Sequence, residues 1–89
     1  MKSQRTHGFM KLLEKLPFHV QKQAKEAFSH FKENPRHPGL HFKCVNSPRA
    51  RYSVRIGSDY RALGRMEGDE IIWYWIGHHG EYDHLIGKK

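Results

Sequence analysis

Two short segments of the chain carry arginine side chains at spacings suited to gripping a phosphate. In residues 51–57 apolar side chains alternate with polar ones, which is typical of a strand with one apolar and one polar face. Residues 60–66 contain two further arginines, four positions apart. Antiparallel pairing of these strands would gather four guanidinium groups on one sheet surface, those of Arg51, Arg55, Arg61 and Arg65. Because like charges repel, a polyanionic partner is the simplest reason to keep them together.

A second group of reactive side chains lies near the C-terminus, in residues 78–84. It holds three histidines, the residue type suited to proton transfer near neutral pH: His78, His79 and His84. Tyr82 and Asp83 could orient them. With positive charge from Arg55 and Arg61, such groups could cleave RNA without a metal, leaving a 2′,3′-cyclic phosphate and a free 5′-hydroxyl. The alternatives are a solvent-exposed polar terminus and a solvated arginine face.

Three other features admit a chemical role but favour a structural one. The clustered histidines could bind zinc, but adjacent histidines on a strand point to opposite faces, so we expect no metal and no cofactor. The Trp-Tyr-Trp run at residues 73–75 could stack nucleobases, although its alternation with isoleucines favours core packing. Cys44, the only cysteine, excludes an intramolecular disulfide, fits a reducing compartment and is expected to be buried and inert.

Length and charge limit the possible classes of protein. The 89 residues allow a single domain spanning residues 1–89, and a hydrophobic content of 37% predicts that it folds. A net charge of +7 favours acidic or phosphate-rich partners. Most lysines lie in residues 1–46 and most arginines in residues 47–89. Because the planar guanidinium group suits phosphate and carboxylate geometry better than an ammonium group does, we expect the second half to bind the partner. With no signal peptide, lipidation motif or membrane-spanning run, we expect a cytoplasmic protein.

Apolar spacing predicts two helices in the first half of the chain. A stripe at helical spacing runs from Phe9 to Leu16, and a longer one runs from Val20 to Phe31. Pro17 separates them, so the two helices form a hairpin. The second helix ends at Asn34, the residue before a proline. Residues 2–8 are polar and form either a frayed arm or a weak edge strand.

The second half predicts strands. Leu40, Phe42 and Cys44 alternate with polar residues, and further strands follow at 51–57, 60–66 and 70–78. The last of these is apolar on both sides, which suits a strand in the middle of a sheet. Residues 80–89 form a short tail that is polar except for Tyr82, Leu85 and Ile86. A helix hairpin followed by an antiparallel meander gives an α+β fold.

Four motifs, in this order, carry a family likeness. They are Leu-Pro at 16–17, Asn-Pro-Arg-His-Pro-Gly-Leu at 34–40, Tyr-Ser-Val-Arg-Ile-Gly-Ser-Asp-Tyr-Arg at 52–61 and Ile-Gly-His-His at 76–79. Over nearly the whole chain the sequence resembles the RelE/ParE superfamily of toxins from type II toxin–antitoxin systems. The resemblance implies a helix hairpin packed on a small curved antiparallel sheet.

The resemblance also implies residue roles. Arg61 matches the arginine that contacts the scissile phosphate in nuclease members. Arg55 matches a basic position that holds the RNA backbone, and His79 matches a position after the last strand that is often Arg or His. After the last strand, family members often carry an arginine and then a Tyr-Arg pair. This chain departs from that pattern in residues 78–84, where Tyr82 could replace the tyrosine only at a shifted position. The catalytic candidates are therefore Arg61, His79, Tyr82 and His84, and the RNA-binding candidates are Arg51, Arg55, Arg65 and Lys43.

Three functions fit this resemblance. The first is a ribosome-dependent endoribonuclease that cleaves mRNA, inhibits translation and is neutralised by an acidic, partly disordered antitoxin. The second is a ParE-like toxin that inhibits DNA gyrase without cutting nucleic acid. The third is an inactive relative that only binds an antitoxin. The implied partners are the antitoxin, the ribosome and mRNA, with operator DNA contacted only through the antitoxin and no membrane.

Overall fold

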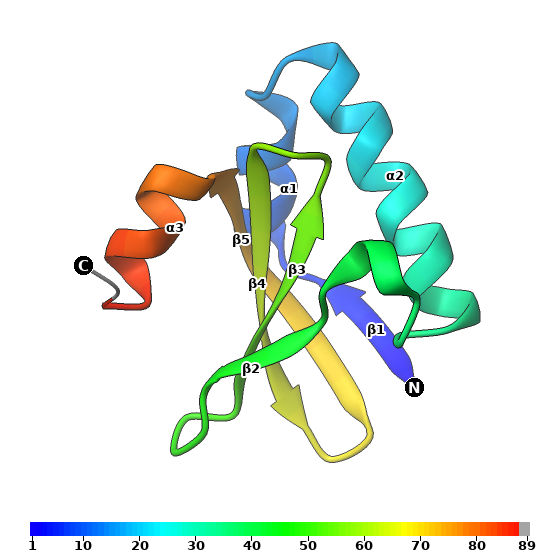
Figure 1. The fold of residues 1–89 in the computed structure, drawn as a ribbon, viewed down its shortest axis with the longest axis vertical. Helices are drawn as coiled ribbons and strands as arrows, with labels where there is room; N and C mark the ends of the chain where they lie inside the picture. The colour runs from blue at the N-terminus through cyan, green and yellow to red at the C-terminus, as the bar shows by residue number, and fades with distance from the viewer. Residues whose placement is uncertain (88–89) are drawn as a thin grey trace.

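A five-stranded sheet with strand order β1-β5-β4-β3-β2 forms the centre of the structure (Figure 1), a computed structural model that describes residues 1–87. All neighbouring strands are antiparallel except β1 and β5, which are parallel. The strands are β1 (Lys2–Arg5), β2 (Lys43–Asn46), β3 (Arg51–Ile56), β4 (Tyr60–Glu67) and β5 (Glu70–His78). The α+β fold predicted from the sequence is confirmed, and β1 adds a parallel edge to the predicted meander.

Helices cover both faces of the sheet. The hairpin of α1 (His7–Glu14) and α2 (Phe18–Glu33) packs on one face, and α3 (His79–Leu85) packs on the other (Figure 1). The start of α1 is fixed by Thr6, whose Oγ1 accepts a hydrogen bond from the Phe9 backbone N–H at 3.0 Å. As predicted, α2 follows Pro17 and ends before Asn34.

The hydrophobic core lies between the helix hairpin and the sheet. Trp73 on β5 is fully buried and packs its indole against Phe28 and Phe31 of α2, with ring centroids 5.2 and 5.4 Å apart. Its Nε1–H donates to Ser3 Oγ on β1 at 2.8 Å, so the indole has both apolar contacts and a polar partner. Strand β5 lies between β1 and β4 and has helices on both faces. This position explains why both of its sides carry apolar residues.

Three predictions are corrected. The strand expected from Leu40 starts later, because Leu40 ends a 3₁₀ turn, η1 (Pro38–Leu40), and His41 is left-handed with φ of 47°. Cys44 is exposed rather than buried, because β2 is an edge strand. The C-terminal tail at 80–89, expected to be a short and mostly polar segment, is largely the helix α3 in residues 79–85, and its positions 88–89 lie outside the described residues. Within the described residues 1–87, no helix has the length and apolar character needed to cross a membrane.

Candidate functional site

The four arginines of β3 and β4 lie on one side of the sheet. In the register of these two strands Arg51 is opposite Arg65, and Arg55 is opposite Arg61. Residues directly opposite each other share a face, so the predicted common surface is confirmed. We call this surface, which lies on the side of the sheet away from α1 and α2, the arginine face. It also carries Ser53 of β3 and Leu63 of β4, which form a cross-strand pair between the two arginine pairs.

Helix α3 covers the middle of the arginine face. Its Tyr82 is only 5% exposed, and the Tyr82 hydroxyl shares a 2.9 Å hydrogen bond with the hydroxyl of buried Ser53. Since Ser53 lies midway between the two arginines of β3, this contact separates the face into two ends. The Arg55–Arg61 pair lies beside the turn that joins β3 to β4. The Arg51–Arg65 pair lies at the opposite end of the same strands.

At the turn end, both guanidinium groups are held by backbone carbonyls. Arg55 Nε donates to the Gly57 carbonyl at 2.9 Å, and Arg61 Nη1 donates to the Tyr60 carbonyl at 2.8 Å. No carboxylate pairs with either group among residues 1–87, where the one ion pair joins Arg65 to Glu67. Both guanidinium groups therefore keep N–H donors that can reach an anion.

Two histidines lie where β5 meets α3, next to this turn. Gly77 is opposite Arg61 in the β4–β5 register, and His78 and His79 follow it directly. The His79 backbone N–H donates to the Asp59 carbonyl at 2.8 Å, which ties the start of α3 to the β3–β4 turn. The two imidazole rings stack with centroids 4.5 Å apart. The structure thus brings predicted residues Arg55, Arg61 and His79 to one end of the sheet.

His78 has a structural role at this junction. Its Nδ1 accepts a hydrogen bond from the Gly80 backbone N–H at 3.2 Å, so His78 caps α3. Its ring also meets the ring of Tyr60 edge-on, with centroids 5.5 Å apart. His79 makes no such capping bond and is exposed. His78 is exposed as well, but its Nδ1 is engaged in the cap, so of the two histidines only His79 has neither ring nitrogen hydrogen-bonded within the described residues.

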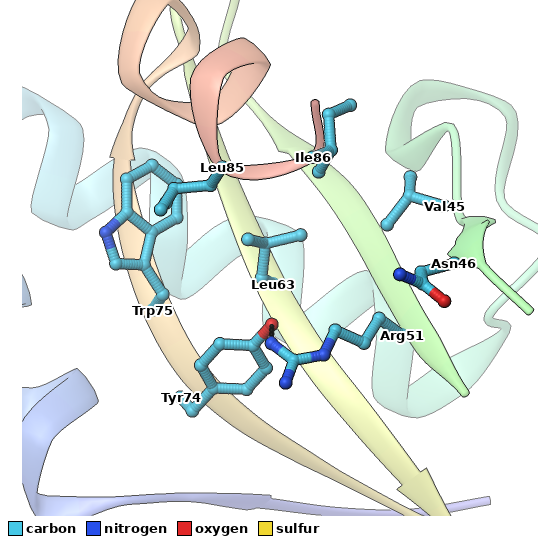
Figure 2. A pocket seen from close by; sticks show the side chains of 8 residues that line it. All are labelled: Val45, Asn46, Arg51, Leu63, Tyr74, Trp75, Leu85 and Ile86. Carbon is cyan, nitrogen blue, oxygen red and sulfur yellow. Dashed lines mark hydrogen bonds between the residues drawn. The ribbon is translucent and has the colours of Figure 1, made fainter. Parts of the chain in front are cut away.

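The other end of the arginine face holds Arg51 against a tyrosine of β5. Arg51 Nη1 donates to the Tyr74 hydroxyl at 2.6 Å, and the guanidinium carbon lies 5.1 Å from the centre of the Tyr74 ring. Both side chains line a small hollow (Figure 2). Its volume is about 150 Å³. Arg51 Nε is buried there without a hydrogen-bond partner. Arg65 pairs with Glu67 at 3.4 Å, with both side chains about half exposed (49% each). At this end Arg51 is committed to internal contacts, whereas Arg65 stays half exposed in a surface ion pair.

Three predicted site residues lie apart from the Arg55–Arg61 pair. Tyr82 is buried and anchors α3 rather than facing solvent. His84 is exposed and lies two residues farther along α3, which turns it about 200° from Tyr82 and so away from the sheet. Lys43 is exposed on the edge strand β2, in register with Ser53. Among residues 1–87, no group of three His, Cys, Asp or Glu side chains is placed to hold a metal ion.

The tryptophan run was only partly predicted. Trp73 is a core residue as expected, but Trp75 lies on the arginine face opposite Leu63. The reason is a bulge in the β4–β5 ladder, which leaves Tyr74 as an extra residue and reverses the alternation. The Trp75 ring lies across Gly77, where an added Cβ would be 2.5 Å from it. Simple alternation in the sequence gives no sign of the bulge.

The sequence matches one family of known proteins over most of its length. The model of the ParE-like toxin domain matches residues 18–84. The chain belongs to this family. It is therefore a toxin of the RelE/ParE superfamily, the type II toxin–antitoxin class that the sequence motifs predicted. No curated protein sequence matches the chain.

Solved structures share the fold of this toxin. The RelB–RelE antitoxin–toxin complex of Methanococcus jannaschii is 24% identical, with 91% of this chain and 96% of that chain covered and a TM-score of 0.71. The RelBE2 toxin–antitoxin complex of Mycobacterium tuberculosis is 23% identical, with 86% and 95% covered and a TM-score of 0.68. The isolated Escherichia coli RelE toxin is 19% identical, with 96% and 97% covered and a TM-score of 0.65. At these identities the likeness concerns the fold.

Proposed function

We propose that this toxin is a ribosome-dependent endoribonuclease that cleaves mRNA and so stops translation in the cytoplasm. The observation that supports the proposal is the Arg55–Arg61 pair, held in register at one end of the sheet without a carboxylate partner. Two opposed guanidinium groups that are fixed by backbone carbonyls form a preorganised site for a phosphate. Placing them together is costly without an anion, because like charges directly opposite each other destabilise a strand pair.

The proposed reaction is attack of the RNA 2′-hydroxyl on the adjacent phosphorus. His79 accepts the 2′-hydroxyl proton, and the new P–O bond forms as the bond to the 5′-oxygen breaks. Arg61 and Arg55 donate hydrogen bonds to the non-bridging oxygens, which carry more negative charge in the transition state than in the substrate. Water supplies the proton that the leaving 5′-oxygen takes up. The products are a 2′,3′-cyclic phosphate and a 5′-hydroxyl, with no metal or cofactor required.

His78 has a positioning role in this proposal. By accepting the Gly80 N–H it fixes the first turn of α3, and the His79–Asp59 backbone bond sets the height of His79 above the β3–β4 turn. Tyr82 takes no part in the chemistry, because its hydroxyl is buried against Ser53. His84 also takes no part, since it lies on the outer side of α3. The proposed catalytic set is thus Arg61, Arg55 and His79.

The proposed regulatory partner is an antitoxin. The Methanococcus jannaschii and Mycobacterium tuberculosis structures are both complexes of a toxin with an antitoxin. The net charge of +7 on this chain favours an acidic antitoxin segment, since opposite charges accelerate encounter and strengthen binding. In this proposal operator DNA is contacted only through the antitoxin.

A second candidate function is inhibition of DNA gyrase. It is favoured by one observation, the burial of Tyr82, which removes the one tyrosine of the C-terminal segment from proton transfer. A ParE-like toxin that binds its target without cutting would need only the charged surface. Loss of gyrase supercoiling activity on addition of the purified toxin, with translated mRNA intact, would favour this function over cleavage.

Cleavage is tested by mapping RNA ends on a translated mRNA. Wild-type toxin is expected to produce new 5′ ends at codon boundaries in the presence of ribosomes. Arg61→Ala should lower the cleavage rate by about 10²- to 10³-fold, the usual effect of removing one preorganised transition-state donor. Arg49→Ala is the control, because Arg49 is an exposed arginine in the β2–β3 turn, at the other end of β3 from the Arg55–Arg61 pair. Equal cleavage by wild type and Arg61→Ala would contradict the proposal.

A further inference from the structure

A second hollow lies on the helix side of the sheet, at the edge formed by β2. Its volume is about 540 Å³, within the range of about 300–1,000 Å³ that is usual for ligand sites. The loop between α2 and β2 forms one wall, and the aromatic rings of Phe42 and Tyr52 form another. Because Tyr52 and Ser53 are neighbours on one strand, this hollow and the arginine face lie on opposite sides of β3. We call it the edge hollow.

The loop wall of the edge hollow is ordered by its own hydrogen bonds. Asn34 Oδ1 accepts from the Arg36 backbone N–H at 3.0 Å, and His37 Nδ1 accepts from the Gly39 N–H at 3.2 Å. Leu40, only 2% exposed, anchors the end of the loop in the core. Two prolines restrict the backbone further. Binding here therefore loses little loop entropy, and the positions of the charged residues are set in advance.

The charge of the edge hollow has a single sign. Arg36 and Lys43 are cations, and His37 and His41 are hydrogen-bonding groups that become cationic on protonation. All four side chains are exposed, and no aspartate or glutamate lines the hollow among the described residues. A site with donors and cations but no carboxylate selects for an anion.

The aromatic wall adds a second kind of contact. The rings of Phe42 and Tyr52 stack with centroids 5.1 Å apart and an interplanar angle of 22°, and Phe31 of α2 meets Phe42 edge-on at 5.0 Å. Tyr52 is therefore supported from within the core while it lines the hollow. A supported aromatic ring beside cations is the arrangement that single-stranded nucleic acid uses, with a base on the ring and a phosphate on the cations.

We infer that the edge hollow binds a nucleotide of single-stranded RNA outside the cleaved bond. This rests on the proposed function for the choice of RNA, but it concerns a separate surface. Lys43 connects the two surfaces, because it is one of the residues around the edge hollow while its register with Ser53 puts its side chain on the arginine-face side of β2. An RNA strand that crosses β2 contacts both surfaces, so the edge hollow contributes affinity while the Arg55–Arg61 pair carries the chemistry.

Binding is tested with a fluorescein-labelled oligo(U) 12-mer and fluorescence anisotropy, without ribosomes. Arg36→Glu should weaken binding by at least tenfold and make it less sensitive to salt, because one phosphate contact is lost. Arg5→Glu is the matched control, since Arg5 is also exposed but lies on β1 at the opposite edge of the sheet. Binding of the control variant should change by less than threefold. Equal losses in the two variants would mean a general charge effect and would overturn the inference.

The aromatic contact is tested at Tyr52. Tyr52→Phe keeps the ring and should bind oligo(U) within twofold of wild type. Tyr52→Leu removes the ring and should weaken binding by about tenfold. Thermal unfolding of each variant shows whether it is folded at the assay temperature. If Tyr52→Leu is folded and binds as wild type does, the base-stacking part is wrong.

An acidic peptide is the competing occupant. A fluorescein-labelled oligo-glutamate 12-mer is measured on the same variants. Weaker binding than oligo(U), with no response to Tyr52→Leu, supports RNA, whereas tighter binding that depends on Arg36 would overturn the inference in favour of a protein partner. The two proposals fail separately, because Arg36→Glu reports on ribosome-free binding and Arg61→Ala on cleavage. If the wild-type toxin binds oligo(U) as expected but does not cleave translated mRNA, only the proposed function is refuted. If it cleaves mRNA but Arg36→Glu leaves oligo(U) binding unchanged, only the edge-hollow inference is refuted.

Discussion

The two faces of the sheet in this toxin differ in what they bury. The face toward α1 and α2 is mostly apolar in β3, β4 and β5, with residues such as Val54, Ile56 and Trp73 almost fully buried. The arginine face carries two pairs of guanidinium groups and is covered only in its middle, by the seven residues of α3. The same strands thus supply stability from one side and positive charge from the other. Substitutions on the two faces should therefore affect different measurements.

The largest difference is expected between Trp73 and Trp75. Trp73→Ala leaves a cavity among Phe28, Phe31 and the sheet and should lower the free energy of unfolding by about 3–5 kcal/mol. Trp75→Ala removes a half-buried ring from the arginine face and should cost clearly less. Urea unfolding followed by far-UV circular dichroism measures both. Equal losses would mean that the arginine face contributes as much packing as the core.

A smaller effect is expected at Tyr82, the contact that holds α3 on the arginine face. Tyr82→Phe leaves the buried Ser53 hydroxyl without its partner, which should lower the free energy of unfolding by about 1–3 kcal/mol. In the double variant Ser53→Ala/Tyr82→Phe both polar groups are gone, and much of that loss should be recovered. Cleavage of translated mRNA by Tyr82→Phe should persist at a temperature where the variant is folded. A loss of cleavage as large as that of Arg61→Ala would instead make Tyr82 catalytic.

The smallest effect is expected for the ion pair at the rim of the arginine face. Glu67→Gln removes the negative charge that pairs with Arg65. Because both side chains are about half exposed (49% each), the free energy of unfolding should change by no more than about 0.5 kcal/mol. Chemical denaturation at low and at high salt measures this change. The freed Arg65 adds to the positive charge of the face, so oligo(U) binding should tighten slightly. A destabilisation above about 1 kcal/mol would show that Arg65 and Glu67 hold the β4–β5 turn.

Much of the fold was predictable because it depends on local periodicity. The stripe from Val20 to Phe31 has helical spacing, and Asn34-Pro35 marks the end of that helix, as observed. The strand predicted at 70–78 matches β5, and the other two strands of the meander differ by one residue at one end. Parallel pairing of β1 was not predictable, since the polar segment gains its place only from long-range bonds such as Trp73 Nε1–H to Ser3 Oγ.

The candidate site was predicted less completely. Alternation in β3 and β4 was sufficient to place four arginines on one face. It could not show that Arg51 contacts Tyr74 while Arg55 and Arg61 bind only backbone carbonyls, because those partners depend on how β5 and the turns pack. The burial of Tyr82 was missed for the same reason. A seven-residue helix has too weak a pattern to be recognised before the sheet that it covers is known.

The sequence by itself determined the two-faced sheet and the family of this toxin, because side-chain alternation and short turn motifs are local properties. Only the tertiary structure decided which charges are available. Availability depends on the bulge that places Tyr74 and Trp75 on the arginine face, on the cap that starts α3, and on the hydrogen bond between Tyr82 and Ser53. These features join residues far apart in the chain, and no local spacing encodes such contacts.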